Sequence, residues 1–175
     1  MSNRISADYL RSILDYDPKT GIFRWKWRYD VPKEWNKRWA GKVAGTKAGN
    51  GYWHIKINYE LFLGHILAWV YVTGEWPKEE IDHRNGHKSE NWFSNLREGS
   101  KNQNMQNVVP HRGGTSKYLG VSWHAQRSKW TARICIDRQK YYLGLFDTEE
   151  DAYAVYLAAK KRLHSFQPIP RDLAA

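Results

Sequence analysis

Apolar and polar residues alternate along this chain in short runs, and the runs predict a series of small elements. Apolar residues recur at helical spacing from Ser6 to Tyr16, which predicts a helix. The run GIFRWKWR, which begins at Gly21, alternates apolar and basic residues as a half-buried strand does. Residues 29–51 are basic and broken by Pro32 and several glycines, so we expect an irregular surface segment there.

The next pattern predicts a hairpin followed by a helix. The run WHIKI alternates, and a two-residue turn at Asn58-Tyr59 or Tyr59-Glu60 leads into ELFLG. Residues 65–72 then have the spacing of a short helix, which Gly74 and Pro77 end.

Residues 81–107 predict a strand, a second strand or loop arm, and a helix. Residues 81–83 are expected to be extended, and Asn85-Gly86 is a strong signal for a tight turn. The chain returns through residues 91–97 and turns again at Glu98-Gly99. Ser100 then caps a helix. So short a unit buries little apolar surface, and we therefore expect polar side chains to organise it.

After a linker at residues 110–116 the pattern predicts three antiparallel strands and one helix. Thr148 is suited to cap that helix, whose first turn is acidic and whose last turns are basic. Alternation predicts an inward face made of Val121, Trp123, Trp130, Ala132, Ile134, Ile136, Tyr141 and Leu143. The opposite face would carry Ser122, His124, Thr131, Arg133, Cys135, Lys140 and Tyr142, with Arg127 and Lys129 at the hairpin tip.

The expected fold is therefore α+β. It has a small ββα unit preceded by a β-hairpin and helix, and a separate three-stranded antiparallel sheet packed on one helix. The expected domains are residues 1–109 (with the ββα core at about 80–107), the linker 110–116, residues 117–167 and a tail at 168–175.

Charge and composition limit the classes of partner that this protein is expected to bind. The formal net charge is +10 and the pI is near 9.7, which favours a polyanionic partner such as nucleic acid. The charge is +5 over residues 1–77, zero over 78–110 and +5 over 111–175, so a neutral segment lies between two basic ones. No apolar run approaches the roughly 18 residues of a membrane span. The sequence gives no sign of a required protein partner.

Cysteine usage excludes two kinds of scaffold. The chain has one cysteine, Cys135, so it can form neither an internal disulfide nor a zinc site with several cysteines. The first 17 residues also lack an apolar core of signal-peptide length. We expect an intracellular protein, which would lie in the cytoplasm of a bacterial host if a phage encodes it.

The stretch IDHRNGHKSENWFSNLREGSKNQN resembles the HNH endonuclease motif of the ββα-metal nucleases, in the form found in phage and intron-encoded homing enzymes. Asp82 and His83 match the motif's Asp-His pair, Asn95 its central Asn, and Asn104 the third position, where many members have His. The upstream run HILAWVYVTGEWP is also typical of these enzymes. The resemblance implies hydrolysis of DNA phosphodiesters with a divalent metal ion.

Those residue types suit that chemistry. A neutral His83 is suited to take a proton from water. The oxygens of Asp82 and Asn104 are hard ligands suited to Mg²⁺, with Mn²⁺ as the alternative. Asn95 is expected to bond backbone groups and orient His83. His65 is expected to cap or pack at its helix start and His87 to be exposed, whereas the remaining asparagines, Asn85, Asn91, Asn102 and Asn107, fit turns, caps or the surface.

Residues 117–166 resemble the AP-two/ERF DNA-binding domain of plant transcription factors, which also occurs joined to HNH nucleases in phages. The matching marks are LGV, KWTARI and LGLFDTEEDAYAVY. The resemblance implies that the outer sheet face enters the major groove of double-stranded DNA. The expected DNA-binding residues are Ser122, His124, Arg127, Lys129, Arg133, Lys140 and Tyr142. Arg133 is the expected base reader, and Lys129 and Lys140 are expected phosphate contacts.

We therefore predict a metal-dependent endonuclease of the nicking, homing type, acting on double-stranded DNA. One alternative is a sequence-specific regulatory DNA-binding protein with an inactive nuclease unit. A structural zinc-type ββα fold is a second alternative, which the single cysteine disfavours.

Overall fold

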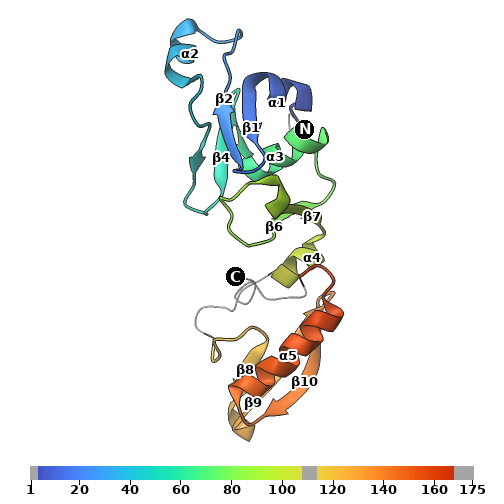
Figure 1. The fold of residues 1–175 in the computed structure, drawn as a ribbon. Helices are drawn as coiled ribbons and strands as arrows, with labels where there is room; N and C mark the ends of the chain where they lie inside the picture. The colour runs from blue at the N-terminus through green and yellow to red at the C-terminus, as the bar shows by residue number, and fades with distance from the viewer. Residues whose placement is uncertain (1–3, 108–113, 168–175) are drawn as a thin grey trace. The chain divides into compact units, whose positions relative to one another are not determined.

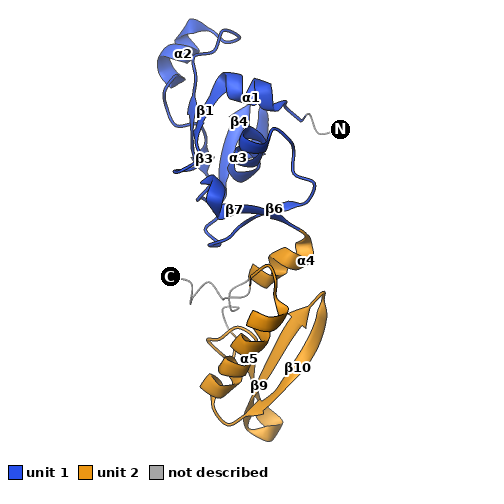
Figure 2. Cartoon of the chain, turned by 45° about the vertical axis from the view of Figure 1, so that its right-hand side comes forward, with its two compact units in different colours: residues 1–99 blue, residues 100–175 orange. Residues whose placement is uncertain are grey.

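The computed structural model describes residues 4–107 and 114–167, which form an α+β protein of small antiparallel sheets and short helices (Figure 1). The chain divides into two compact units, residues 1–99 and residues 100–175 (Figure 2). Residues 110–113 of the predicted linker and the predicted tail lie outside the described residues, so the predicted domain limits stay predictions. Among the described helices, none has the length and apolar character that crossing a membrane requires.

The first unit opens with a helix that is shorter than the sequence predicts. Helix α1 (Ala7–Ile13) is capped by the Ser6 side chain, which accepts a hydrogen bond from the Tyr9 backbone. Strand β1 (Leu14–Asp17) follows at once and pairs antiparallel with β2 (Ile22–Trp25). The prediction of helix up to Tyr16 is wrong because alternate residues of β1 are buried, and this pairing with β2 outweighs the helical spacing.

A second helix lies where we expected irregular chain. Helix α2 (Lys33–Trp39) starts after Pro32, and the short strand β3 (Thr46–Lys47) follows. The buried Asn36 side chain accepts a hydrogen bond from the Arg28 backbone N–H at 2.9 Å and donates one to its carbonyl at 2.6 Å. A tertiary anchor therefore stabilises this short helix, and the hydrophobic pattern of the segment does not reveal it.

The predicted hairpin and helix are confirmed. Strands β4 (Trp53–Ile57) and β5 (Glu60–Leu63) pair through a turn at Asn58 and Tyr59, both of which have positive φ, and β3 lies on the other side of β4. Helix α3 (Gly64–Thr73) continues directly from β5 and ends at Gly74 in the left-handed region. Together with α1, β1, β2 and β4, it encloses the buried core of the first unit, which includes Leu10, Leu14, Phe23, Ile55, Leu67 and Val70.

The Asn-rich stretch forms the last hairpin of the first unit. Strand β6 (Glu80–His83) pairs antiparallel with β7 (Leu96–Gly99), and the 3-10 turn η1 (Phe93–Asn95) precedes β7. The turn predicted at Glu98-Gly99 is wrong, because both residues pair with β6. The apolar pattern could not fix this register, since β7 is only four residues long.

The second unit begins with a short helix that the sequence predicts. Ser100 and Gln103 form a capping box at the start of α4 (Lys101–Asn104), and the 3-10 turn η2 (Met105–Asn107) follows. The buried Lys160 donates from Nζ to the Gln106 carbonyl at 2.8 Å, and Arg138 donates to Asn102 at 3.0 Å. These bonds tie the segment to the sheet and helix that complete the unit.

That sheet has the order β10-β9-β8, from strands β8 (Val121–His124), β9 (Lys129–Ile136) and β10 (Gln139–Phe146). The 3-10 turn η3 (Ala125–Arg127) joins β8 to β9. Helix α5 (Glu149–Leu163), capped by Thr148 as predicted, packs on the sheet. Val121, Ala132 and Ile134 are buried against it.

At three positions of this sheet, the side chain does not have the burial that the alternating pattern predicts. Trp123 and Tyr141, predicted to face inward, are exposed, whereas Thr131, predicted to face outward, is buried. Trp123 lies opposite Trp130 near the strand ends, and the two rings are 5.2 Å apart. A register shift between Tyr142 and Gly144 also interrupts the β9–β10 pairing. The core under α5 is too short to cover every inward position of the long strands.

Candidate active site

The β6–β7 hairpin places Asp82 and His83 as neighbours on one strand. His83 pairs in register with Leu96 and is 4% exposed, whereas Asp82 pairs with Arg97 and is half-buried. Adjacent strand residues point to opposite faces, so the two side chains leave the strand in different directions. Burial lowers the pKa of His83, and the charge of the nearby Asp82 carboxylate opposes part of that lowering, so the two groups interact electrostatically.

Asn91 holds the His83 ring. The two side chains form a hydrogen bond of 3.0 Å between His83 Nε2 and Asn91 Oδ1. An amide oxygen only accepts, so Nε2 carries the proton and the neutral ring has its lone pair on Nδ1. Burial is the main influence on His83 and lowers its pKa, with the Asn91 bond and nearby carboxylates opposing it. A neutral ring with a defined tautomer is the form that a general base needs.

The fold clamps Asn91 itself. Tyr16 donates from its hydroxyl to the Asn91 carbonyl at 2.7 Å. Gly21 has φ +74°, and a Cβ there would lie 2.3 Å from the Asn91 carbonyl carbon. A Cβ on Gly64 would lie 2.8 Å from the Asn91 amide nitrogen. Asn91 is 2% exposed as a result, so the expectation of a turn or surface role for it is wrong.

Asn95 organises the loop that carries Asn91. Its Nδ2 donates to the Glu90 carbonyl at 2.8 Å and to Asn85 Oδ1 at 3.0 Å, and its Oδ1 accepts from the Asn85 backbone at 3.1 Å. Two of these bonds, to the Glu90 carbonyl and from the Asn85 backbone, are of the kind that we expected of Asn95. Asn91, on the same loop, supplies the bond to the His83 ring described above.

Two further rings surround His83. His65 lies on the first turn of α3, with its ring centroid 4.9 Å from that of His83, and Tyr52 lies 6.2 Å from His83. Burial, followed by the neighbouring His83 and His54, lowers the pKa of His65 to about 3. His65 is therefore neutral near pH 7 and packs at the helix start, in line with expectation. His87 is exposed as expected and lies 3.2 Å from a Glu90 carboxylate oxygen.

Asp82 and Asn104 provide oxygens of the type that Mg²⁺ prefers, so the predicted donors fit a hard divalent ion by their chemistry. No cluster of three or more His, Cys, Asp or Glu suited to a metal occurs within residues 4–107 and 114–167. An ion held here would therefore also need oxygens from amides, water or phosphate. Asn104 belongs to α4 in the second unit, and its convergence with Asp82 and His83 stays a prediction.

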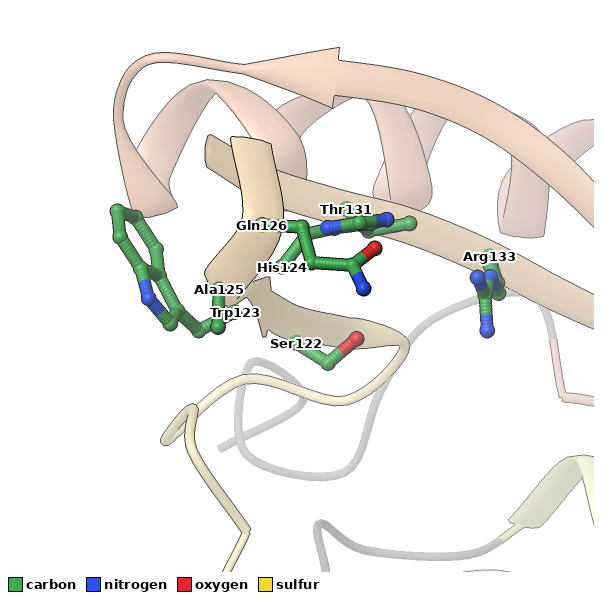
Figure 3. Close-up of a pocket in the computed structure, with 7 residues that line it drawn as sticks. All are labelled: Ser122, Trp123, His124, Ala125, Gln126, Thr131 and Arg133. Atoms are coloured by element: carbon green, nitrogen blue, oxygen red, sulfur yellow. The ribbon is translucent and has the colours of Figure 1, made fainter. Parts of the chain in front are cut away.

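The outer sheet face of the second unit contains a pocket of about 320 Å³ (Figure 3). Three of the predicted DNA-binding residues, Ser122, His124 and Arg133, line it together with Trp123, Ala125, Gln126 and Thr131. Arg133 is exposed on β9 and lies apart from His124 and Gln126 in Figure 3.

The other predicted DNA contacts lie on strands β9 and β10 and in the turn η3. Arg127, Lys140 and Tyr142 are exposed. Lys129 forms an ion pair of 2.8 Å with the exposed Asp147. Because that pair is solvated, it costs little to break when a phosphate competes for the ammonium group.

Residues 62–106 match a family model described as HNH endonuclease. The matched segment runs from β5 through α3 and the β6–β7 hairpin to η2, and so includes His65, Asp82, His83, Asn91 and Asn95. This match supports a DNA-cleaving nuclease and is compatible with the small ββα unit predicted from the sequence. No curated protein matches the chain, and no solved structure does.

Proposed function

We propose that this protein is a metal-dependent endonuclease that hydrolyses phosphodiester bonds in double-stranded DNA, as a nicking enzyme of the homing type. The observation that carries the proposal is the buried His83 ring, which Asn91 holds in one tautomer beside Asp82, within the segment that matches the HNH family. A polar arrangement of this kind contributes little to a core and is suited to proton transfer.

In the proposed reaction, His83 Nδ1 takes the proton of the attacking water, and Asn91 stabilises the resulting imidazolium through Nε2. Asp82 and Asn104 would hold the divalent ion, Mg²⁺ or Mn²⁺. When bound, such an ion neutralises charge on the phosphate and stabilises the leaving oxygen. The sequence contains this motif once, so in the proposed reaction a single visit cuts one strand.

Nicking of supercoiled plasmid by the purified protein tests this proposal. Open-circular product that requires Mg²⁺ or Mn²⁺ is the expected result, and sequencing of the new ends gives the target. If the protein binds DNA tightly yet never nicks it with any divalent ion or target library, it is the regulatory DNA-binding protein of the alternative.

We assign DNA recognition to residues 117–167, as an AP-two/ERF-like domain, and cleavage to residues 1–109. The exposed Arg133 beside the sheet pocket supports a base contact. Replacing Arg133 with Ala is expected to weaken discrimination between preferred and unrelated sequences by about 1–3 kcal/mol.

Selection from a randomised duplex library measures this change. Lys140→Ala is the matched control, because loss of a phosphate contact weakens binding to all sequences about equally. An unchanged sequence preference in Arg133→Ala removes the base-reading role.

A second DNA contact is proposed on α2. Lys37 and Arg38 are exposed on this helix, and the Asn36 anchor holds the helix in place. Replacing both with Glu is expected to weaken DNA binding about tenfold or more and to flatten the slope of log affinity against log salt by about 2.

Titration at several salt concentrations measures both changes. The control is Lys161→Glu with Arg162→Glu on α5, which changes the net charge equally on a helix packed against the inner sheet face. Equal losses in the two double variants would show that net charge, rather than α2, is responsible.

A further inference from the structure

The side chain of Asp82 is held by Arg97 on the paired strand. Arg97 lies directly opposite Asp82 in the register, and its Nη2 and Nε lie 2.8 and 3.1 Å from Asp82 Oδ2. The two side chains are 9% and 17% exposed. This is a largely desolvated charge pair, in which loss of either partner leaves the other charge buried and uncompensated, so the pair fixes both groups.

The geometry of the pair has a chemical consequence. Both Arg97 donors converge on the same carboxylate oxygen, which fixes the rotation of the carboxylate and engages Oδ2. A divalent ion coordinated by Asp82 would share this carboxylate with Arg97. The guanidinium would then lie within a few ångströms of that ion and repel it.

Resting on the proposed function, we propose that Arg97 is a positioning residue for metal binding. It holds the Asp82 carboxylate in one orientation for the divalent ion, and its positive charge keeps the affinity of the free protein for that ion low. A DNA phosphate then supplies the missing negative charge, so that the ion and the DNA substrate bind cooperatively.

This role predicts two changes of opposite sign. In Arg97→Gln the repelling charge is lost and Oδ2 is released. Mn²⁺ should therefore bind the DNA-free protein about tenfold more tightly, while single-turnover cleavage at saturating Mn²⁺ falls about tenfold or more because the carboxylate is misoriented. A residue that only supports the fold would lower both quantities.

Two other substitutions separate charge from geometry. Arg97→Lys keeps the charge without the fork of donors, so its Mn²⁺ affinity should stay near that of the parent while cleavage falls. Arg84→Gln removes an exposed neighbouring charge and should leave Mn²⁺ affinity within about threefold of the parent. A third substitution, Asp82→Asn, removes the proposed carboxylate ligand and should abolish the measured Mn²⁺ binding.

Mn²⁺ binding to the full-length, DNA-free protein is measured by electron paramagnetic resonance of the unbound ion, and cleavage by plasmid nicking. The proposal is overturned if Arg97→Gln binds Mn²⁺ no more tightly than the parent, including the case in which neither binds at millimolar concentration. It is also overturned if Arg97→Gln cleaves at the parent rate. Failure of the parent to nick any DNA contradicts the proposed function instead, so the two failures are distinguishable.

Discussion

Replacing His83 with Ala is expected to lower the cleavage rate by about 10²–10⁴-fold, the range attributed to a general base. The reason is that the neutral ring, with its proton on Nε2 and its lone pair on Nδ1, is the proton acceptor in the proposed reaction. The substitution removes no charge at neutral pH, so DNA affinity should change by less than about threefold. Single-turnover nicking and a gel-shift titration measure the two quantities.

Burial of His83 requires a control for folding, since truncation of a buried ring also leaves Asn91 without this partner. Thermal unfolding of His83→Ala should therefore be compared with that of the parent, and nicking measured well below both midpoints. The matched control is His87→Ala, whose exposed ring lies four residues along the same loop. Parent-like nicking by a folded His83→Ala would remove His83 from the reaction.

Local patterns were sufficient for much of the fold. The alternating runs predicted a hairpin turning at Asn58-Tyr59 or Tyr59-Glu60, and the structure has the first of these turns. Capping residues predicted the starts of α4 and α5 at Ser100 and Thr148. The secondary-structure predictions that failed share a cause. In each, tertiary contacts favoured a different structure from the one that the local pattern predicts. Leu14 extends to pair with β2, and α2 forms where Asn36 binds the Arg28 backbone.

In the candidate site, too, some residues could be recognised from local sequence and others depend on tertiary contacts. The adjacent Asp82 and His83, with Asn95 at a set spacing, could be recognised from the sequence because chemistry and spacing are local properties. The contact of Asn91 with His83 could not be recognised in this way, because nothing in the sequence distinguishes Asn91 from the other asparagines of the loop. Its role depends on Gly21 and Gly64, which are 70 and 27 residues away and approach it closely.

Asn91→Ala is expected to lower the cleavage rate by about 10³-fold with little change in DNA affinity. Loss of an orienting partner lowers metal affinity or activity by about 10–100-fold in metal sites, and loss of the correct imidazole tautomer in a catalytic triad lowers the rate by about 10⁴-fold. Without Asn91 Oδ1, the hydrogen bond that selects the proton on Nε2 of His83 is lost. The effect should appear in the single-turnover rate at saturating DNA.

A conservative substitution tests whether Asn91 acts through the hydrogen bond. Asn91→Asp keeps an oxygen that accepts from Nε2, so its rate should lie within about tenfold of the parent. Asn36→Ala is the stability control, because it removes an equally buried asparagine that bonds the Arg28 backbone. It should destabilise the protein comparably, by about 1–3 kcal/mol, yet keep the parent rate at saturating DNA. If Asn91→Ala and Asn36→Ala lose activity only in proportion to their loss of stability, Asn91 supports the fold and does not orient the base.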